Sequence, residues 1–215
     1  GFSDTDRLVI VHTDDIGMCQ ASLTAFEHLW AFGTISSGAV MVPCPWFPSV
    51  AKLCRENPQV DMGVHATLNA EWTSYRWGPV ATRDPESGLL DAECYFHQWH
   101  PAVYENAKPE AVAAEVNAQV ERALAAGMDV THVDSHMGTI LHPKFIQTYL
   151  RAALSHNLPP MLPRANAKGF DALGVSDEAM AVYSPILNQL DEQGIPMLDG
   201  LYGMPLSGEG DHLEI

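Results

Sequence analysis

The chain has 215 residues, 47% of them hydrophobic, which is enough for one compact domain with a sizeable core. It carries 27 acidic side chains against 11 basic ones, a formal net charge of -16, and such a field repels nucleic acids and anionic membrane surfaces. The sequence contains no apolar run of membrane-spanning length and no signal peptide, so we expect a cytoplasmic protein that contacts neither nucleic acid nor membrane.

The cysteines do not have the spacing of a metal site or a disulfide framework, because none of them forms a Cys-x-x-Cys pair. We therefore expect free thiols in a reducing compartment. The cysteines are Cys19, Cys44, Cys54 and Cys94.

An alternation of strands and helices can be followed from the N-terminus. Four consecutive aliphatic residues at 8–11 predict a buried first strand over residues 7–13. A helix is expected over residues 20–32, with Gly33 as its C-cap. The next expected elements are a strand at 37–42, a helix at 46–56 and a strand at 61–68.

The segment 70–108 interrupts this rhythm with tryptophans, prolines and glycines, and it is either a functional lid or a loop packed by its own aromatics. After it, Pro109 and a stripe of aliphatic side chains predict a helix that ends at Gly127. The remaining expected elements are a strand at 129–134, a helix at 143–155, a strand near 160–163, a helix at 176–193 and a strand at 195–198.

Six strand–helix units in succession imply an α/β fold with a parallel sheet covered by helices. A closed eight-unit barrel would need more chain. The predicted architecture is therefore an irregular or incomplete (β/α) barrel, with an open doubly wound sheet as the alternative. Residues 1–215 are expected to form a single catalytic domain. In both architectures, ligands bind at the C-terminal ends of the parallel strands.

Two adjacent carboxylates, Asp14 and Asp15, follow the first aliphatic run. Two like charges beside an apolar core repel each other and resist desolvation, and a bound cation would relieve both costs. Aspartates at this place also serve as turn residues or helix N-caps. Since neighbouring strand residues point to opposite faces, both can serve one site only if the backbone leaves strand geometry, which Gly17 would assist.

Imidazoles stand at the ends of two later strands. His65 ends the third strand, and the fourth ends in His132, Asp134 and His136. Together with Asp15, the imidazoles of His65 and His136 would bind a divalent ion and leave positions open for water and substrate. The sequence therefore predicts a metal site at the C-terminal strand ends. For each histidine taken alone, the alternative is a hydrogen-bonded structural role.

One further histidine, His142, follows the fourth strand and could face the same pocket. The other histidines have no such placement, so we expect them at the surface or in packing contacts. They are His28, His97, His100, His156 and His212.

Three spaced motifs stand out: Thr13-Asp14-Asp15-Ile16-Gly17, Gly63-Val64-His65 and His132-Val133-Asp134-Ser135-His136. In this order they resemble the YdjC-like carbohydrate deacetylases, of which the chitooligosaccharide deacetylases are the best-known members. The segment from Trp72 to Trp77, followed by Gly88-Leu89-Leu90-Asp91, is similar to a loop of the same family. The resemblance covers most of the chain.

The resemblance implies an irregular (β/α) barrel, a divalent metal ion and the hydrolysis of an acetamido group on a sugar, often by a homodimer. It also implies that Asp15, His65 and His136 bind the ion and that Asp14 is the general base. The predicted function is therefore a metal-dependent hydrolase that removes the acetyl group from an N-acetylated amino sugar or oligosaccharide. Magnesium and zinc are the ions expected first, and manganese, iron, cobalt and nickel stay open.

The chain departs from the family pattern at two places. Gly138 stands where a second histidine usually follows, and no late-strand histidine motif precedes the last residue, Ile215. The second departure predicts either that the domain lacks its C-terminal segment here or that His142 or His12 donates the proton to the leaving group.

Six further side chains are expected to contact a substrate. They are Trp72, Tyr75 and Trp77, as stacking surface for a sugar ring, and His132, Asp134 and His142. Loop aromatics serve simple packing as often, and the sugar and the linkage of its acetyl group stay open. A hydrolase of another amide, ester or phosphoester, and a non-catalytic sugar-binding or metal-binding protein, are the alternative functions.

Overall fold

The computed structural model describes residues 2–3, 5–168 and 177–203, and the chain divides into two compact units. The first unit is Gly1–Pro160 and the second is Met161–Ile215. Residues 204–215, which include His212 and bear on the predicted lack of a late-strand histidine motif, lie outside the described residues.

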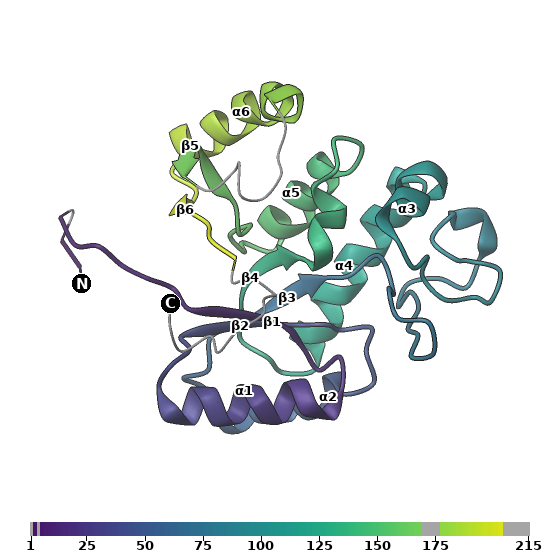
Figure 1. The fold of residues 1–215 in the computed structure, drawn as a ribbon, viewed down its shortest axis with the longest axis horizontal. Helices are drawn as coiled ribbons and strands as arrows, with labels where there is room; N and C mark the ends of the chain where they lie inside the picture. Colours follow the sequence, from purple (N-terminus) through teal and green to yellow (C-terminus); the bar gives the residue numbers. More distant parts are fainter. Residues whose placement is uncertain (1, 4, 169–176, 204–215) are drawn as a thin grey trace, which may run out of the picture. The chain divides into compact units, whose positions relative to one another are not determined.

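The first unit contains a parallel sheet of four strands, which confirms the α/β fold (Figure 1). The strands lie in the order β1-β2-β3-β4, so each crossover moves one place in the same direction. A doubly wound sheet reverses its order at a switch point, whereas successive barrel strands do not. The described strands do not close a ring, and the barrel stays a prediction. The strands are β1 His12–Ile16, β2 Ser37–Val40, β3 Met62–Ala66 and β4 Val130–Ser135.

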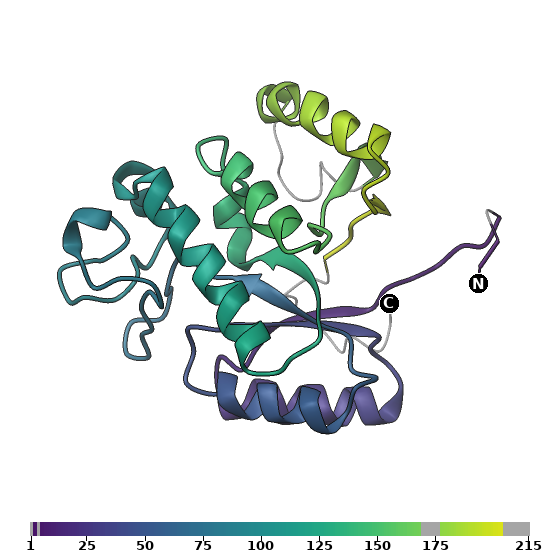
Figure 2. The same ribbon diagram turned by 180° about the vertical axis from the view of Figure 1, so that it is seen from behind.

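The helices of the first unit follow the predicted alternation, and both views show α1 and α2 on one side of the strands (Figures 1 and 2). The short helix α3 and the two 3-10 turns, η1 and η2, were not predicted, because segments of one or two turns carry too few residues to show a period. Among the described residues, no helix has the length and apolarity needed to cross a membrane. The helices are α1 Gln20–Phe32, α2 Phe47–Glu56, α3 His100–Asn106, α4 Pro109–Ala125 and α5 Ile146–Ser155, and the turns are η1 Pro85–Ser87 and η2 His136–Leu141.

The aliphatic run at 8–11 is not the buried strand that its composition predicts. Leu8, Val9 and Ile10 are 59%, 82% and 58% exposed, and β1 begins only at His12. Among the described strands, β1 pairs with β2 only. The exposure of the run shows that no described residues cover it. The prediction of a strand at 7–13 was therefore wrong at its start, and the aspartates lie inside β1 rather than after it.

Two polar side chains of α4 form hydrogen bonds with the backbone of the long segment after β3. Glu115, fully buried, accepts the backbone N–H groups of Val80 and Ala81 at 3.0 and 2.8 Å. Gln119 accepts from the N–H of Thr67 and donates to its carbonyl, at 3.0 and 2.8 Å. These bonds satisfy backbone groups that a buried loop would otherwise leave unpaired, and they hold the exit of β3 in place.

The second unit has its own small sheet, in which β5 (Pro163–Lys168) and β6 (Leu198–Gly200) run parallel. Between them lies α6 (Asp177–Glu192), close to the predicted helix, and it buries Leu187 and Leu190. Both strands begin later than the predicted strands at 160–163 and 195–198. The guanidinium of Arg164 in β5 pairs with carboxylates on α6 and β6, which ties the three elements together.

We predict that Gly17→Ala destabilises the protein more than Gly33→Ala. Both glycines have left-handed backbones, with φ of +82° and +83°, so alanine meets a similar strain of about 1–2 kcal/mol at each. A Cβ at Gly17 would also lie 2.9 Å from Cγ2 of Val50, whereas a Cβ at Gly33 would meet nothing within 4 Å. Urea denaturation measures the two free energies of unfolding, and equal losses would contradict the prediction.

Candidate metal centre

The backbone of β1 leaves regular strand geometry at its two aspartates, as the sequence predicts. Asp15 has a φ of 57° and Gly17 a φ of 82°. The pairing with β2 shifts register between Thr13 and Ile16. A left-handed backbone is uncommon for a residue with a Cβ, although aspartate adopts it more readily than most. The turn releases Asp15 from the alternation that would send it to the face opposite Asp14.

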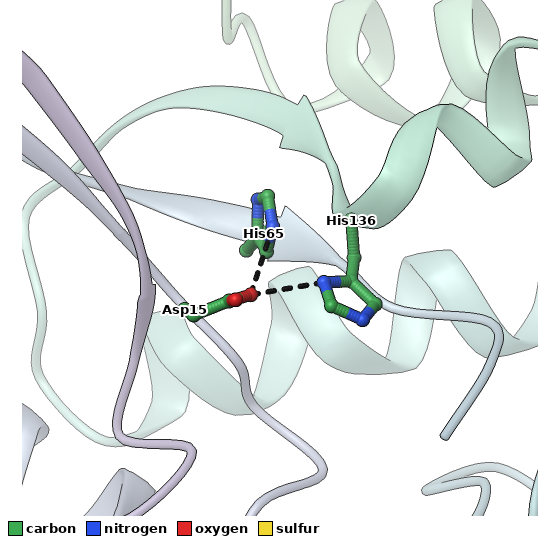
Figure 3. Close-up of side chains that lie close together, drawn as sticks. All are labelled: Asp15, His65 and His136. Atoms are coloured by element: carbon green, nitrogen blue, oxygen red, sulfur yellow. Dashed lines mark ion pairs between the residues drawn. The ribbon is translucent and has the colours of Figure 1, made fainter. Parts of the chain in front are cut away.

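Three side chains that the sequence grouped as metal ligands converge in space (Figure 3). Asp15 comes from β1, His65 from β3, and His136 directly follows β4. Oδ1 of Asp15 lies 3.4 Å from Nε2 of His65 and 2.9 Å from Nδ1 of His136. One potential ligand atom of each residue lies within 4.8 Å of the others, and both imidazoles are buried. The spacing suits three ligands of a single ion.

Two buried atoms of this cluster have no hydrogen-bond partner among the described residues: Oδ1 of Asp15 and Nε2 of His65. An unsatisfied buried polar atom costs about 1–3 kcal/mol, and native proteins contain few of them. A divalent cation would satisfy both atoms through their lone pairs. Two imidazole nitrogens and one carboxylate oxygen form a donor set that suits zinc and other divalent transition ions. The residues present therefore fit a metal ion.

In each of the two histidines, the ring nitrogen that does not face Asp15 makes a hydrogen bond with another carboxylate. Oδ1 of Asp134 lies 2.6 Å from Nδ1 of His65, and Oε2 of Glu71 lies 3.0 Å from Nε2 of His136. Because an ionised carboxylate only accepts, these two nitrogens carry the N–H and donate it. In the neutral rings, Nε2 of His65 and Nδ1 of His136 then turn lone pairs toward Asp15, which is the tautomer that a ligand needs.

The charges of the cluster support one another. Burial alone would raise the pKa of Asp15, but His136 and His65 outweigh burial and hold that pKa well below its ordinary value. Burial alone would lower the pKa of His65, but Asp134 and Asp15 raise it. The pKa of His136 is also raised, because Asp15 and Glu71 oppose the effect of burial. The cluster therefore favours the protonated form of both imidazoles and the ionised form of Asp15.

Glu71 was missed by sequence reasoning. It stands in the segment that follows β3, where no periodicity reveals which side chains turn inward. Its only signal is an acidic side chain soon after the strand that carries His65, in a loop of the kind that often builds sites.

The predicted general base, Asp14, is exposed, and the structure gives it no hydrogen bond or ion pair with the described residues. Asp14 and His12 are two residues apart in β1, so their side chains start on the same face of the strand. Nε2 of His12 lies 3.1 Å from Oδ2 of Asp134, the carboxylate that also holds His65. His12, on that face of β1, thus contacts the carboxylate that holds a ligand candidate, and the role of Asp14 as general base stays a prediction.

The histidines named for substrate contact lie in two different surroundings. The ring of His132 occupies the space beside Gly63, where a Cβ would lie 2.5 Å from its Nε2, and its centroid is 5.2 Å from that of His12. The ring of His142 stacks on Tyr104 at a centroid distance of 3.9 Å. Neither ring belongs to the ligand cluster, so substrate contact stays a prediction for both.

The three loop aromatics differ in exposure. Trp72 is 53% exposed, whereas Trp77 is 3% exposed and lies 6.3 Å, between ring centroids, from His136. Tyr75 donates its hydroxyl to the carbonyl of Met18 at 2.6 Å and so ties the loop to the segment after β1. Trp72 therefore offers the largest open aromatic surface of the three, and Trp77 packs beside a ligand candidate.

Two predictions concern other side chains. All four cysteines lie among the described residues and are free thiols, as predicted. None of His28, His97, His100 and His156 belongs to the ligand cluster, and their surface or packing roles stay predictions.

Comparison with known proteins places this geometry in context. The family model described as "YdjC-like protein" matches residues 8–212. A carbohydrate deacetylase of Thermus thermophilus is 31% identical over 199 residues, which are 93% of this chain and 68% of that protein. A carbohydrate deacetylase of Thermoanaerobacter pseudethanolicus is 25% identical, over 71% of this chain and 59% of that protein. A chitooligosaccharide deacetylase of Yersinia enterocolitica is 27% identical, over 76% and 62%.

A solved structure, described as a cellobiose-phosphate cleavage protein of Enterococcus faecalis, has a similar fold. Its TM-score is 0.68 at 23% identity, and the match covers 87% of this chain and 65% of that one. The chain thus spans about two thirds of the Thermus protein and less than two thirds of the other relatives and of the solved structure.

Removal of one ligand side chain should abolish stoichiometric metal binding. Asp15→Ala and His65→Ala each take away one of three donors and leave the other buried groups uncompensated. Elemental analysis after dialysis against zinc should find the metal in the parent protein and in the exposed-site control Asp129→Ala, but not in these two variants. A variant that keeps one metal per chain would not have lost a ligand.

Metal binding should release protons and weaken as the pH falls. The pKa of His65 is raised to about 10, so its ring holds a proton near neutral pH; the pKa of His136 is also raised, and Asp15 is already ionised. A metal needs the bare nitrogens, and its binding should therefore displace about one to two protons. Calorimetry of zinc binding in two buffers of different ionisation enthalpy measures this number, and equal heats in both would contradict it.

Proposed function

The chain belongs to the YdjC-like family, and on that premise we propose that it is a metal-dependent carbohydrate deacetylase, which hydrolyses the acetyl group of an N-acetylated amino sugar or oligosaccharide. The carbohydrate deacetylases among its relatives support the reaction and the substrate class. The observation that carries the metal dependence is the convergence of Oδ1 of Asp15 and Nε2 of His65, two buried atoms that lie 3.4 Å apart and make no hydrogen bond among the described residues. The family match extends across both compact units, which supports one catalytic domain.

Asp15, His65 and His136 would hold the ion, and Asp134 and Glu71 would keep the two imidazoles oriented. When bound, a divalent ion supplies a Lewis acid that polarises a carbonyl group and lowers the pKa of a water molecule. The carboxylates behind the histidines are in place before any ligand arrives, so the donor atoms need little reorganisation on binding.

Asp14 would accept the proton of the attacking water. Water at neutral pH is a weak nucleophile toward an amide, so the reaction needs a base at the point of attack. The carboxylate of Asp14 is exposed and pairs with no described side chain, whereas the neighbouring carboxylate of Asp15 is engaged by two histidines. The two adjacent aspartates would thus divide the work between proton transfer and metal binding.

The surface beside the cluster suits a neutral sugar better than a polyanionic one. The net charge of -16 opposes the approach of anions, and deacetylation of an amino sugar yields a cationic product. The exposed ring of Trp72 would stack on the apolar face of a sugar, with Tyr75 holding the loop that carries it. The homodimer that the family resemblance implies stays a prediction.

Asp14→Asn should keep the metal but lower turnover by about 10²–10⁴-fold, because it removes the base and leaves the ligand set intact. The assay measures acetate release from N-acetylglucosamine oligomers by zinc-loaded protein, with Asp129→Asn as an exposed matched control. A near-normal rate for Asp14→Asn would remove its role as base.

The same assay separates the proposed function from its alternatives. Hydrolysis of an ester or phosphoester without acetate release from the amide would favour another hydrolase. Sugar binding without turnover under any of several divalent metals would favour a non-catalytic protein.

A further inference from the structure

His12 bridges two polar groups in the interior of the first unit. Its Nε2 lies 3.1 Å from Oδ2 of Asp134, and its Nδ1 lies 3.2 Å from Oγ of Ser37. The other oxygen of Asp134 faces His65 at 2.6 Å. One buried carboxylate therefore holds two imidazoles, one from β1 and one from β3, and only the second belongs to the ligand cluster.

The hydrogen bonds of Ser37 show which group is the donor in its contact with His12. Ser37 donates its single hydroxyl proton to Oδ1 of Asp61 at 2.9 Å. Its oxygen can then only accept, so Nδ1 of His12 must be the donor. On the other side of the ring, the carboxylate of Asp134 also only accepts, so Nε2 must donate as well. Both ring nitrogens of His12 therefore face groups that accept a hydrogen bond.

The neighbouring His132 has a different state by the same reasoning. Thr131 donates its hydroxyl to Oδ1 of Asp61 at 2.9 Å, so Nδ1 of His132 donates to Oγ1 of Thr131, also at 2.9 Å. Among the described residues, Nε2 of His132 is buried without a hydrogen-bond partner, as expected of an unprotonated nitrogen. Burial lowers the pKa of His132 and outweighs the opposing effect of Asp134, and the nearby His12 acts in the same direction as burial. The two rings lie 5.2 Å apart and differ in their hydrogen-bond partners.

The contact of His12 satisfies a buried carboxylate. Asp134 is 2% exposed, and a carboxylate at such depth is costly unless both of its oxygens have partners. His65 contacts one oxygen at 2.6 Å and His12 contacts the other at 3.1 Å. The contact with the second oxygen stops the carboxylate from rotating away from His65.

We propose that His12 is a positioning residue of the metal centre: its ring anchors Asp134, and Asp134 in turn fixes the ring orientation and tautomer of His65. The inference rests on the proposed function, because it assumes that His65 is a metal ligand. It adds a residue that touches neither the ion nor the substrate but sets how well a ligand is presented.

The protonation state can be measured in the metal-free protein. Nitrogen-15 NMR of the histidine side chains should show an N–H at both nitrogens of the ring whose signals the His12→Gln variant removes. The ring of His132 should show one protonated and one bare nitrogen. A His12 ring with an unprotonated Nε2 would overturn the proposal.

The effect on the metal can be measured by competition with a chelator. His12→Ala should weaken zinc binding by about 10–100-fold, as loss of a partner behind a ligand usually does. His12→Gln places an amide N–H near the position of Nε2 and should recover part of the loss. The exposed control His28→Ala should bind zinc as the parent protein does.

Each result of the competition experiment has a distinct meaning. Parent-like affinity in a folded His12→Ala, checked by circular dichroism and thermal unfolding, would overturn the role of His12 alone. A His12→Gln variant no better than His12→Ala would overturn the hydrogen bond to Asp134 as its basis. Absence of zinc binding by the parent protein would refute the proposed function itself.

Discussion

The left-handed backbone at Asp15 is the constraint on which the site depends. In a regular strand, Asp14 and Asp15 would face opposite sides of the sheet, and only one could reach the cluster. The turn costs about 1–2 kcal/mol for a residue with a Cβ, and the contacts of Asp15 with His65 and His136 offset that cost. The neighbouring aspartates can then hold two different roles beside one ion.

The site also requires polar side chains in the interior of the first unit, next to the ligand cluster. Asp134 and Glu71 hold the two imidazoles from behind, and a buried carboxylate needs opposite charge or several hydrogen bonds. The hydrogen bonds of Asp134 reach β1 through His12, across two intervening strands. The preorganisation of the ligands is therefore a property of the whole sheet rather than of three side chains.

Much of the site could be predicted from sequence because strand ends of a parallel sheet share one edge. That rule brought Asp15, His65 and His136 together although they come from separate strands, and the alternation rule predicted the irregular backbone near Gly17. Both rules use only the order and period of residues along the chain.

The parts that were missed depend on information that a single sequence does not contain. Hydrophobicity predicted a buried strand at 8–11, but burial also needs a covering layer, and the described residues provide none there. Glu71 lies in a loop without a period. The contact of His12 with Asp134 depends on the relative register of β1 and β4, which do not pair directly.

The central claim is that Asp15, His65 and His136 bind one divalent ion. Anomalous diffraction from crystals of the zinc-loaded protein tests it most directly. The account predicts one anomalous peak at about 2.0–2.2 Å from Oδ1 of Asp15, Nε2 of His65 and Nδ1 of His136. A peak elsewhere, or coordination through Nδ1 of His65 or Nε2 of His136, would contradict the roles assigned to these residues and to the carboxylates behind them.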